Sequence, residues 1–243
     1  MIFAAGLGTR LKPITDNMPK ALVPVLGKPL LEHVIEKLKM AGFDEIILNI
    51  HHFGQQIIDF VASKDSFGIR IEFSDERERL LDTGGAIKKA GWFIDEDESI
   101  LIHNVDILSD IDIAQVYNQH IHNNAMATLV VSERETARYF LFNKKDSLKG
   151  WVNEKTGETK SPLHDFNYLN YQKLAFSGIH ILSAEALKLM NDLPDKFSII
   201  DFYISICNKN NVQSYLSNES SMIDVGKLDS LKKAEKFLQL KME

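Results

Sequence analysis

The chain has 243 residues, of which 44% are hydrophobic and 26% charged, a composition typical of a globular protein with one large α/β domain or two small ones. Its net charge of −6 argues against a nucleic-acid partner, and it lacks the roughly 18 consecutive apolar residues that predict a membrane span. The single cysteine, Cys207, excludes an internal disulfide framework. We therefore expect a cytoplasmic protein with no membrane partner, and we interpret Cys207 as a buried thiol.

The N-terminal half alternates short apolar runs with segments of helical spacing. The predicted strands are Ile2–Ala5, Glu45–Ile50, Ile69–Phe73, Ser99–His103 and Ala127–Val131. The predicted helices are Pro29–Ala41, which Gly42 ends, Gln55–Ala62, Thr83–Ala90 and Ile111–His122. This β-α-β-α order predicts an α/β fold with a doubly wound, mostly parallel sheet, in which ligands bind beyond the carboxyl ends of the strands.

A polar segment, residues 133–173, interrupts this alternation. It contains β-like runs at Tyr139–Phe142 and Leu148–Val152 and a predicted hairpin turn at Lys155–Thr159. We interpret it as an excursion of the same domain. The elements predicted after it are strands Leu174–Leu182 and Val212–Leu216 and helices Ala184–Met190, Ile199–Cys207 and Leu228–Leu240.

A glycine-rich turn, Gly6-Leu-Gly8, follows the first predicted strand, and Arg10 and Lys20 come soon after it. Two glycines let backbone N–H groups approach phosphate oxygens closely, and the cations neutralise their charge. Leu11 stands where a dinucleotide fingerprint needs a third small residue, and the Gly-Lys-Ser/Thr of a P-loop is absent. Taken alone, the two glycines are equally well explained as a plain turn.

Two aspartates and a Gly-Gly pair are the other candidates. Asp106 and Asp224 each follow an apolar run, although a helix cap or a solvated surface acid explains either one alone. In Leu81–Ala86, the functional interpretation of the Gly-Gly pair is a backbone platform on which a nucleobase would lie without a side-chain clash. The structural alternative is that Thr83 is the N-cap of the next helix. His103 is expected to be a strand residue.

The string Ala4-Ala-Gly-Leu-Gly-Thr-Arg-Leu-Lys-Pro13, followed by Pro19-Lys-Ala-Leu-Val-Pro-Val25, resembles the signature of sugar-1-phosphate nucleotidyltransferases. The resemblance implies the Rossmann-like, three-layer α/β/α fold of nucleotide-diphospho-sugar transferases. It implies one domain over residues 1–243, with residues 133–173 on the sugar side. It also implies transfer of a nucleotidyl group from a nucleoside triphosphate (NTP) to a sugar-1-phosphate, which releases pyrophosphate.

The resemblance also implies a role for each candidate residue. Arg10 is expected to stabilise the leaving pyrophosphate and Lys20 the reacting phosphates, whereas Asp106 and Asp224 would together hold Mg²⁺. The implied nucleotide contacts are Ala4, Ala5, Gly6, Gly8, Thr9, Thr83, Gly84, Gly85 and Asn104. The implied sugar contacts are Ser177 and Gly178. Val105 stands where the family usually has glycine, and the family's asparagine before Gly178 is absent.

Within the family, the short length and the segments His52–Ile57 and Asp82–Gly85 are most similar to N-acetylmuramate-1-phosphate uridylyltransferases. UTP is therefore the favoured substrate, with GTP and dTTP as alternatives. Mannose-1-phosphate guanylyltransferase and glucose-1-phosphate thymidylyl- or uridylyltransferase activities stay open, as does a monomer or a homodimer. The alternative outside enzymes is a catalytically silent nucleotide-sugar sensor, which the presence of both aspartates disfavours. A Rossmann oxidoreductase is disfavoured by the missing third glycine.

Overall fold

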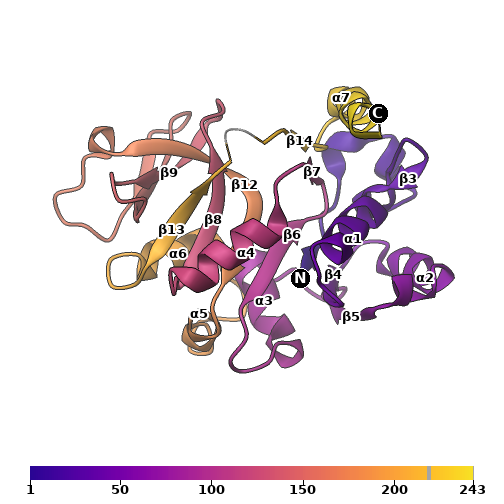
Figure 1. The fold of residues 1–243 in the computed structure, drawn as a ribbon, viewed down its shortest axis with the longest axis horizontal. Coiled ribbons are helices and arrows are strands. Elements are labelled where there is room, and N and C mark those ends of the chain that lie inside the picture. Colours follow the sequence, from indigo (N-terminus) through magenta and orange to yellow (C-terminus); the bar gives the residue numbers. More distant parts are fainter. Residues whose placement is uncertain (218–219, 243) are drawn as a thin grey trace. The chain divides into compact units, whose positions relative to one another are not determined.

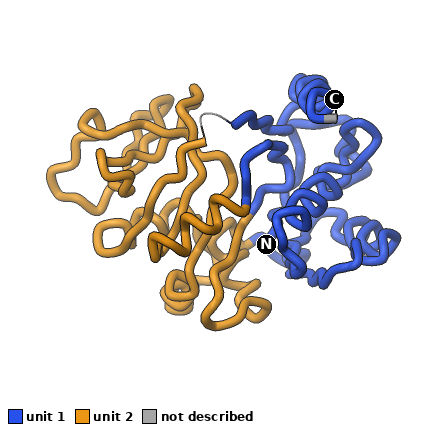
Figure 2. The backbone as a smooth tube through the Cα atoms, viewed as in Figure 1, with its two compact units in different colours: residues 1–80, 103–113, 220–243 blue, residues 81–102, 114–219 orange. Residues whose placement is uncertain are grey.

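The computed structural model describes residues 1–217 and 220–242. Its backbone divides into two compact units (Figure 2). Unit 1 comprises Met1–Leu80, His103–Ile113 and Ser220–Glu243, and unit 2 comprises Leu81–Ile102 and Ala114–Glu219. The expectation of a single domain stays a prediction.

Unit 1 is built on parallel strands (Figure 1). The strands are β1 (Ile2–Phe3), β4 (Glu45–Ile50), β5 (Arg70–Asp75) and the end of β6 (Ile100–Asn104). Strand β1 pairs in parallel with both β4 and β6, and β4 pairs in parallel with β5, with Asn49 opposite Ser74. In β4, Ile46, Ile47, Leu48 and Ile50 are at most 1% exposed, as expected for a parallel strand covered on both faces.

Three helices complete unit 1, and each lies within two residues of its predicted bounds. They are α1 (Leu30–Met40), α2 (Gly54–Ser63) and α7 (Leu228–Met242). Helix α1 buries the predicted apolar stripe of Leu30, Leu31, Val34, Ile35 and Leu38. Gly42 adopts a φ of +95° after the end of α1, in the left-handed region that glycine favours. This local pattern was sufficient to predict the helix and its end.

Two short antiparallel ladders in unit 1 were not predicted. One pairs β2 (Pro24–Val25) with β3 (Lys28–Pro29), and the other pairs β7 (Ile107–Ser109) with β14 (Met222–Asp224). Strands of two or three residues carry too little periodicity to be recognised, and β14 finds its partner far away in the sequence. The 3₁₀ turns of this unit are Thr9–Leu11, Ile14–Asp16, Lys20–Leu22 and Asp65–Gly68.

Unit 2 is organised around the long strand β12 (Gln172–Leu182), which pairs antiparallel with β8 (Ala127–Ser132) and β9 (Arg138–Phe142). Strand β10 (Leu148–Asn153) continues antiparallel from β9 to β11 (Glu158–Lys160), and β13 (Val212–Leu216) runs parallel to β8. The β-like runs expected in residues 133–173 are thus confirmed, and the expected turn joins β10 to β11. With parallel pairs in unit 1, the strands make a mixed sheet with helices, which confirms the α/β class.

The remaining helices are α3 (Asp82–Lys89), α4 (Ile113–His122), α5 (Ala184–Leu189) and α6 (Ile199–Ile206), with 3₁₀ turns at Ala90–Phe93 and Tyr168–Asn170. Ser183 and Ser198 cap α5 and α6 by accepting hydrogen bonds from the N–H groups of Ala186 and Ile200, both at 3.2 Å. Cys207 follows α6 and is buried, as predicted, and this burial raises the pKa of its thiol to about 11. In the part of the chain that the structure describes, no helix is both long and apolar enough to cross a membrane.

Replacing Gly84 with alanine is expected to destabilise unit 2. A Cβ at Gly84 would lie 2.2 Å from Cε2 of the Phe197 ring, which is far inside van der Waals contact. Overpacking of this kind costs about 1–3 kcal/mol in the free energy of unfolding, which urea denaturation would measure. Gly91→Ala is the matched control, because a Cβ at Gly91 meets nothing within 4 Å. Equal stabilities of the two variants would contradict the prediction.

Candidate functional site

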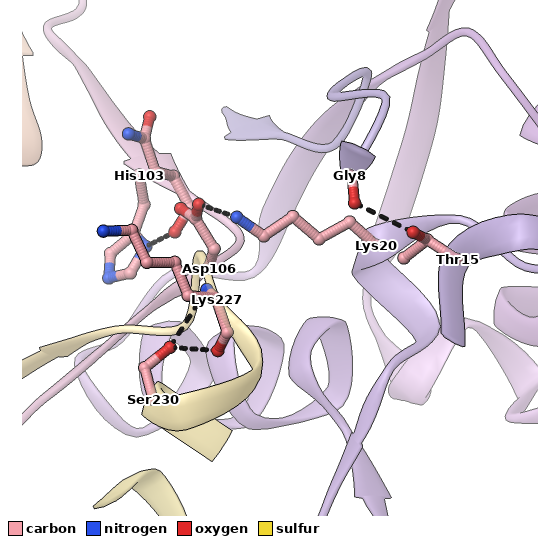
Figure 3. A network of polar contacts seen from close by, with 8 residues as sticks. Gly8, Thr15, Lys20, His103, Asp106, Lys227 and Ser230 are labelled. Atoms are coloured by element: carbon pink, nitrogen blue, oxygen red, sulfur yellow. Dashed lines mark hydrogen bonds and ion pairs between the residues drawn. The ribbon is translucent and has the colours of Figure 1, made fainter. Parts of the chain in front are cut away.

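The loop after β1 is shaped by Gly8. This residue has a φ of +65°, in the left-handed region. Its carbonyl oxygen accepts a hydrogen bond from the Thr15 hydroxyl at 2.8 Å (Figure 3) and another from the Leu11 N–H at 2.9 Å. A Cβ at Gly8 would lie 3.0 Å from Cγ2 of Thr15 and 3.1 Å from Cβ of Lys20. Gly8 is therefore required both by its backbone conformation and by the close packing of the loop against Lys20.

The same loop presents a run of uncommitted backbone amides. The N–H groups of Ala4 and Ala5 donate to Oδ1 of Asn49, at 2.7 and 3.3 Å. Among the described residues, none accepts a hydrogen bond from the N–H groups of residues 6–10. Successive free N–H groups beside a left-handed glycine are the usual means by which a backbone loop binds an anion. Of the predicted nucleotide contacts, Gly6, Gly8 and Thr9 thus have amides available for phosphate.

Lys20 and Asp106, which are far apart in the sequence, form an ion pair. Figure 3 shows the Lys20 ammonium directed at the Asp106 carboxylate, and Oδ2 of Asp106 accepts its hydrogen bond. The Lys20 side chain is 9% exposed and that of Asp106 is 20% exposed. In this structure Lys20 therefore supplies the counter-charge of a carboxylate that was predicted to bind a metal. The sequence suggested a role for each residue but not their pairing.

The β7–β14 ladder brings the segments of the two predicted metal ligands together. Asp224 lies opposite Ile107, and the Val225 N–H donates to the Asp106 carbonyl oxygen at 2.8 Å. Two carboxylates are a donor set that suits Mg²⁺, which keeps water and substrate phosphates as its other ligands. Within residues 1–217 and 220–242, no three or more His, Cys, Asp or Glu side chains are grouped to hold a metal. The magnesium site stays a prediction.

Gly226 explains how Arg10 reaches this region. A Cβ at Gly226 would lie 2.7 Å from Oδ1 of Asp224 and 2.9 Å from Nη2 of Arg10. The guanidinium group therefore packs over the glycine backbone, next to the Asp224 carboxylate. Sequence reasoning singled out Asp224 but assigned no role to Gly226, two residues later.

His103 and Asn104 end strand β6, where Asn104 lies opposite Phe3 and so borders the start of the loop. The His103 ring is completely buried, and its Nδ1 donates to the Asn104 carbonyl oxygen at 2.8 Å. Burial lowers the pKa of His103 to about 4, so that the ring is neutral at pH 7. His103 is a strand residue, as predicted.

The predicted residues Thr83, Gly84 and Gly85 belong to unit 2 and have a structural role there. Helix α3 begins at Asp82, and the Thr83 hydroxyl accepts a hydrogen bond from the Ile199 N–H at 3.0 Å. Thr83 thus supports the start of α6, and the alternative that it caps its own helix is wrong. The N–H groups of Gly84 and Gly85 both donate to the Phe197 carbonyl oxygen, at 2.9 and 3.2 Å. Close packing accounts for the two glycines without a ligand, and their contact with a nucleobase stays a prediction.

Ser177 and Gly178, the predicted sugar contacts, lie in an irregular part of β12. The register against β8 shifts between Phe176 and His180, and Gly178 has a φ of +75° within this bulge. Ser177 is 1% exposed, and its hydroxyl has no partner among the described residues. The bulge explains the glycine, and the sugar contact stays a prediction.

If the loop binds the phosphates of an NTP, as the family resemblance implies, replacing Gly6 with alanine is expected to weaken that binding without affecting folding. A Cβ at Gly6 meets nothing within 4 Å, so the thermal midpoint of unfolding should not change. A methyl group on the loop would obstruct the close approach of phosphate, and loss of one good contact raises KM for the NTP by about tenfold. Steady-state kinetics and thermal unfolding would measure the two effects. An unchanged KM for the NTP would contradict the prediction.

Sequence reasoning missed four residues that shape this region: Asn49, Thr15, Gly226 and Glu76, whose Oε1 accepts a hydrogen bond from Nδ2 of Asn49 at 2.9 Å. Only Asn49 carried a signal, because it is a polar residue within the otherwise apolar end of Glu45–Ile50. A buried polar side chain in a strand needs hydrogen-bond partners, and here they are the amides of the loop.

The chain is similar to several curated proteins. The D-glycero-α-D-manno-heptose 1-phosphate guanylyltransferase of Aneurinibacillus thermoaerophilus is 29% identical over 98% of this chain and 97% of its own length. The N-acetylmuramate α-1-phosphate uridylyltransferase of Caulobacter vibrioides is 39% identical over 44% of both chains. The UTP–glucose-1-phosphate uridylyltransferase of Synechocystis sp. is 33% identical over 54% of this chain and 36% of its own length. The chain thus spans less than half of the length of these two curated uridylyltransferases, 44% and 36%.

Solved structures are similar over the same length. HddC from Yersinia pseudotuberculosis, complexed with GMP-PN, is 25% identical, with a TM-score of 0.74 over 98% of this chain and 97% of that one. UDP-glucose pyrophosphorylase from Acinetobacter baumanii has a TM-score of 0.77 over 100% and 98% of the two chains, and at 18% identity it shows the fold alone. The family model described as nucleotidyl transferase matches residues 1–241, a span that includes both the glycine loop and the two aspartates, and the chain therefore belongs to the nucleotidyl transferase family.

Proposed function

We propose that this protein transfers a nucleotidyl group from an NTP to a sugar-1-phosphate. The observation that carries the proposal is the run of uncommitted amides at residues 6–10, next to the Lys20–Asp106 ion pair. A triphosphate needs several hydrogen-bond donors and at least one cation within a short distance, and this loop offers both. The family match supports the same reaction.

In the proposed reaction, a phosphate oxygen of the sugar-1-phosphate attacks the α-phosphorus of the NTP. A new P–O bond forms, and the bond from the α-phosphorus to the bridging oxygen breaks, so that pyrophosphate leaves with its electron pair. The nucleophile is already an anion, and therefore no general base is required. The chain's task is to position the two phosphates and neutralise their charge.

Each charged residue has a distinct part in this scheme. The N–H groups of residues 6–10 bind the triphosphate, Arg10 stabilises the leaving pyrophosphate, and Lys20 moves from Asp106 to the reacting phosphates. Asp106 and Asp224 would hold Mg²⁺, which supplies further charge neutralisation when bound. Because the amides of Ala4 and Ala5 are committed to Asn49, these residues would contact the nucleotide through carbonyl or methyl groups.

For the substrates we propose UTP and N-acetylmuramate 1-phosphate. The 39% identity to the Caulobacter vibrioides uridylyltransferase supports this pair, although it extends over only 44% of the chain. A second candidate is transfer of a guanylyl group to a heptose 1-phosphate. The Aneurinibacillus thermoaerophilus relative, a guanylyltransferase for such a sugar, matches 98% of the chain and so supports this alternative.

A pyrophosphate-release screen tests the proposal. UTP, GTP, dTTP and CTP would each be combined with the 1-phosphates of N-acetylmuramate, heptose, mannose and glucose, with and without Mg²⁺. The highest kcat/KM is expected for UTP with N-acetylmuramate 1-phosphate, and only with Mg²⁺. A preference for GTP with heptose 1-phosphate would select the second candidate. Nucleotide binding without turnover of any pair would favour a silent nucleotide-sugar sensor and reject the enzyme.

A further inference from the structure

We propose that Asn49 and Glu76 form a brace that positions the phosphate-binding loop, so that both act as positioning residues for the NTP. The inference rests on the proposed function, because it assigns NTP binding to the loop that the brace holds. Neither residue belongs to the loop or to the charged group around Asp106. Their effect would pass entirely through the backbone of Ala4 and Ala5.

Both the oxygen and the nitrogen of the Asn49 side-chain amide make hydrogen bonds. Asn49 lies near the carboxyl end of β4 and is 4% exposed. Its Oδ1 accepts from the N–H groups of Ala4 and Ala5, at 2.7 and 3.3 Å, and its Nδ2 donates to Oε1 of Glu76 at 2.9 Å. Backbone N–H groups can only donate, so the Asn49 oxygen must face Ala4 and Ala5, and its NH2 group is then left to donate to Oε1 of Glu76. The orientation of the Asn49 amide is therefore determined by its backbone partners.

Glu76 is itself fixed in place. It follows β5 and is 1% exposed. Its N–H donates to the Ile50 carbonyl oxygen at 2.8 Å, and its carbonyl oxygen accepts from Nδ1 of His51 at 2.7 Å and from the Arg79 N–H at 3.1 Å. The backbone of Glu76 is thus attached to the end of β4. Its carboxylate can hold Asn49 in one orientation because its backbone is hydrogen-bonded to residues 50 and 51 and not to the loop.

The hydrogen bonds of Asn49 separate the backbone amides of the loop into two groups. The amides of Ala4 and Ala5 are committed to Asn49, whereas those of residues 6–10 have no acceptor among the described residues. A buried N–H group without a partner is costly, so loss of Oδ1 at this position would make the backbone turn to find another acceptor. A turn at Ala4–Ala5 would redirect the following amides. We infer that the brace keeps these amides aimed at the triphosphate before it binds.

The inference can be tested by exchanging the hydrogen-bond donor at position 49 and the acceptor at position 76. In Asn49→Asp, two carboxylates face each other, and the contact to Glu76 becomes repulsive. In the double variant Asn49→Asp with Glu76→Gln, the new amide at position 76 can donate to the new carboxylate at position 49, and the number of carboxylates returns to that of the wild type. Glu76→Gln alone keeps an acceptor for Asn49 and is the matched control. If Asn49→Asp does not fold, Glu76→Ala replaces it, because this variant removes the acceptor and leaves Asn49 in place.

The kinetic test compares the change in KM for the NTP with the change in KM for the sugar-1-phosphate. Asn49→Asp is expected to raise KM for the NTP by about tenfold, as loss of a well-placed charged hydrogen bond does. KM for the sugar-1-phosphate should stay within about twofold of the wild type, as for a change with no local contact. The double variant and the Glu76→Gln control should both return KM for the NTP close to the wild-type value.

Hydrogen exchange gives a readout that does not need activity. The amides of Ala4 and Ala5 are expected to exchange about tenfold faster in Asn49→Asp than in the wild type or the double variant, because their acceptor is displaced. Equal exchange in all three proteins would overturn the brace. If the wild type is active and Asn49→Asp has the same KM for the NTP, the positioning role is overturned, while the hydrogen-bonded brace itself is not. An equal rise of both KM values that the double variant does not reverse would show a merely structural role. A wild type inactive with every substrate pair would instead reject the proposed function, and the exchange result would still stand.

Discussion

Replacing Asp106 with asparagine is expected to lower kcat by roughly 10²–10³-fold, the usual effect of removing one group that stabilises transition-state charge. The carboxylate is the ion-pair partner of Lys20 and, in the proposed reaction, one of two ligands that hold Mg²⁺. An amide oxygen occupies the same position but cannot neutralise either cation. Pyrophosphate release under saturating substrate would measure the loss.

The same variant should also be less stable. The Lys20 side chain is 9% exposed, and without the Asp106 carboxylate its ammonium loses this ion pair in a largely buried position. An unsatisfied buried group costs about 1–3 kcal/mol, which urea unfolding would detect. Asp59→Asn is the matched control, because Asp59 in α2 makes an exposed hydrogen bond with Gln55. Turnover of Asp106→Asn at the control rate would reject the metal assignment.

Replacing Lys20 with methionine is expected to lower kcat/KM by roughly 10²–10³-fold for the same electrostatic reason. It should also strengthen binding of Mn²⁺, a probe for Mg²⁺, to the nucleotide-free protein by about tenfold, because one positive charge no longer competes for the Asp106 carboxylate. Calorimetric titration with Mn²⁺ measures this effect independently of turnover.

Lys28→Met is the control for this second prediction. Lys28 also pairs with a carboxylate, that of Glu36, but the two side chains are 38% and 44% exposed, and exposed pairs contribute little. This variant should bind Mn²⁺ and turn over like the wild type. If Lys20→Met bound Mn²⁺ no better than Lys28→Met, the proposed competition between Lys20 and the metal for Asp106 would be rejected. If Lys20→Met nevertheless lost turnover, the role of Lys20 toward the phosphates would still stand.

Much of the fold could be predicted because its signals are local. The apolar spacing of α1, the run of buried residues in β4 and the stop at Gly42 each lie within a few consecutive residues. The β7–β14 ladder could not be predicted in this way. Its strands have three residues each, and their pairing depends on a chain segment that returns only near the C-terminus.

The same difference between local signals and long-range contacts applies to the candidate site. The residue types at Gly6, Gly8, Arg10 and Lys20 could be recognised from spacing and from resemblance to a family. Their partners could not be recognised, since the ion pair of Lys20 with Asp106 and the bonds of Asn49 to Ala4 and Ala5 join positions far apart in the chain. Gly84 and Gly85 are the reverse case. Their functional interpretation stays a prediction, whereas close packing explains why they are glycines, against the Phe197 ring at Gly84 and the Asp195 carbonyl oxygen at Gly85.

The sequence by itself determined the α/β class, the bounds of the main helices and strands to within about two residues, and the family, because short-range periodicity and a contiguous motif encode them. The tertiary structure decided which amides of the loop are free, which carboxylate Lys20 contacts, and that Asn49 holds the loop. These properties depend on the register of β1 with β4 and of β7 with β14. Such a register is set by packing of the whole unit and leaves no contiguous pattern in the chain.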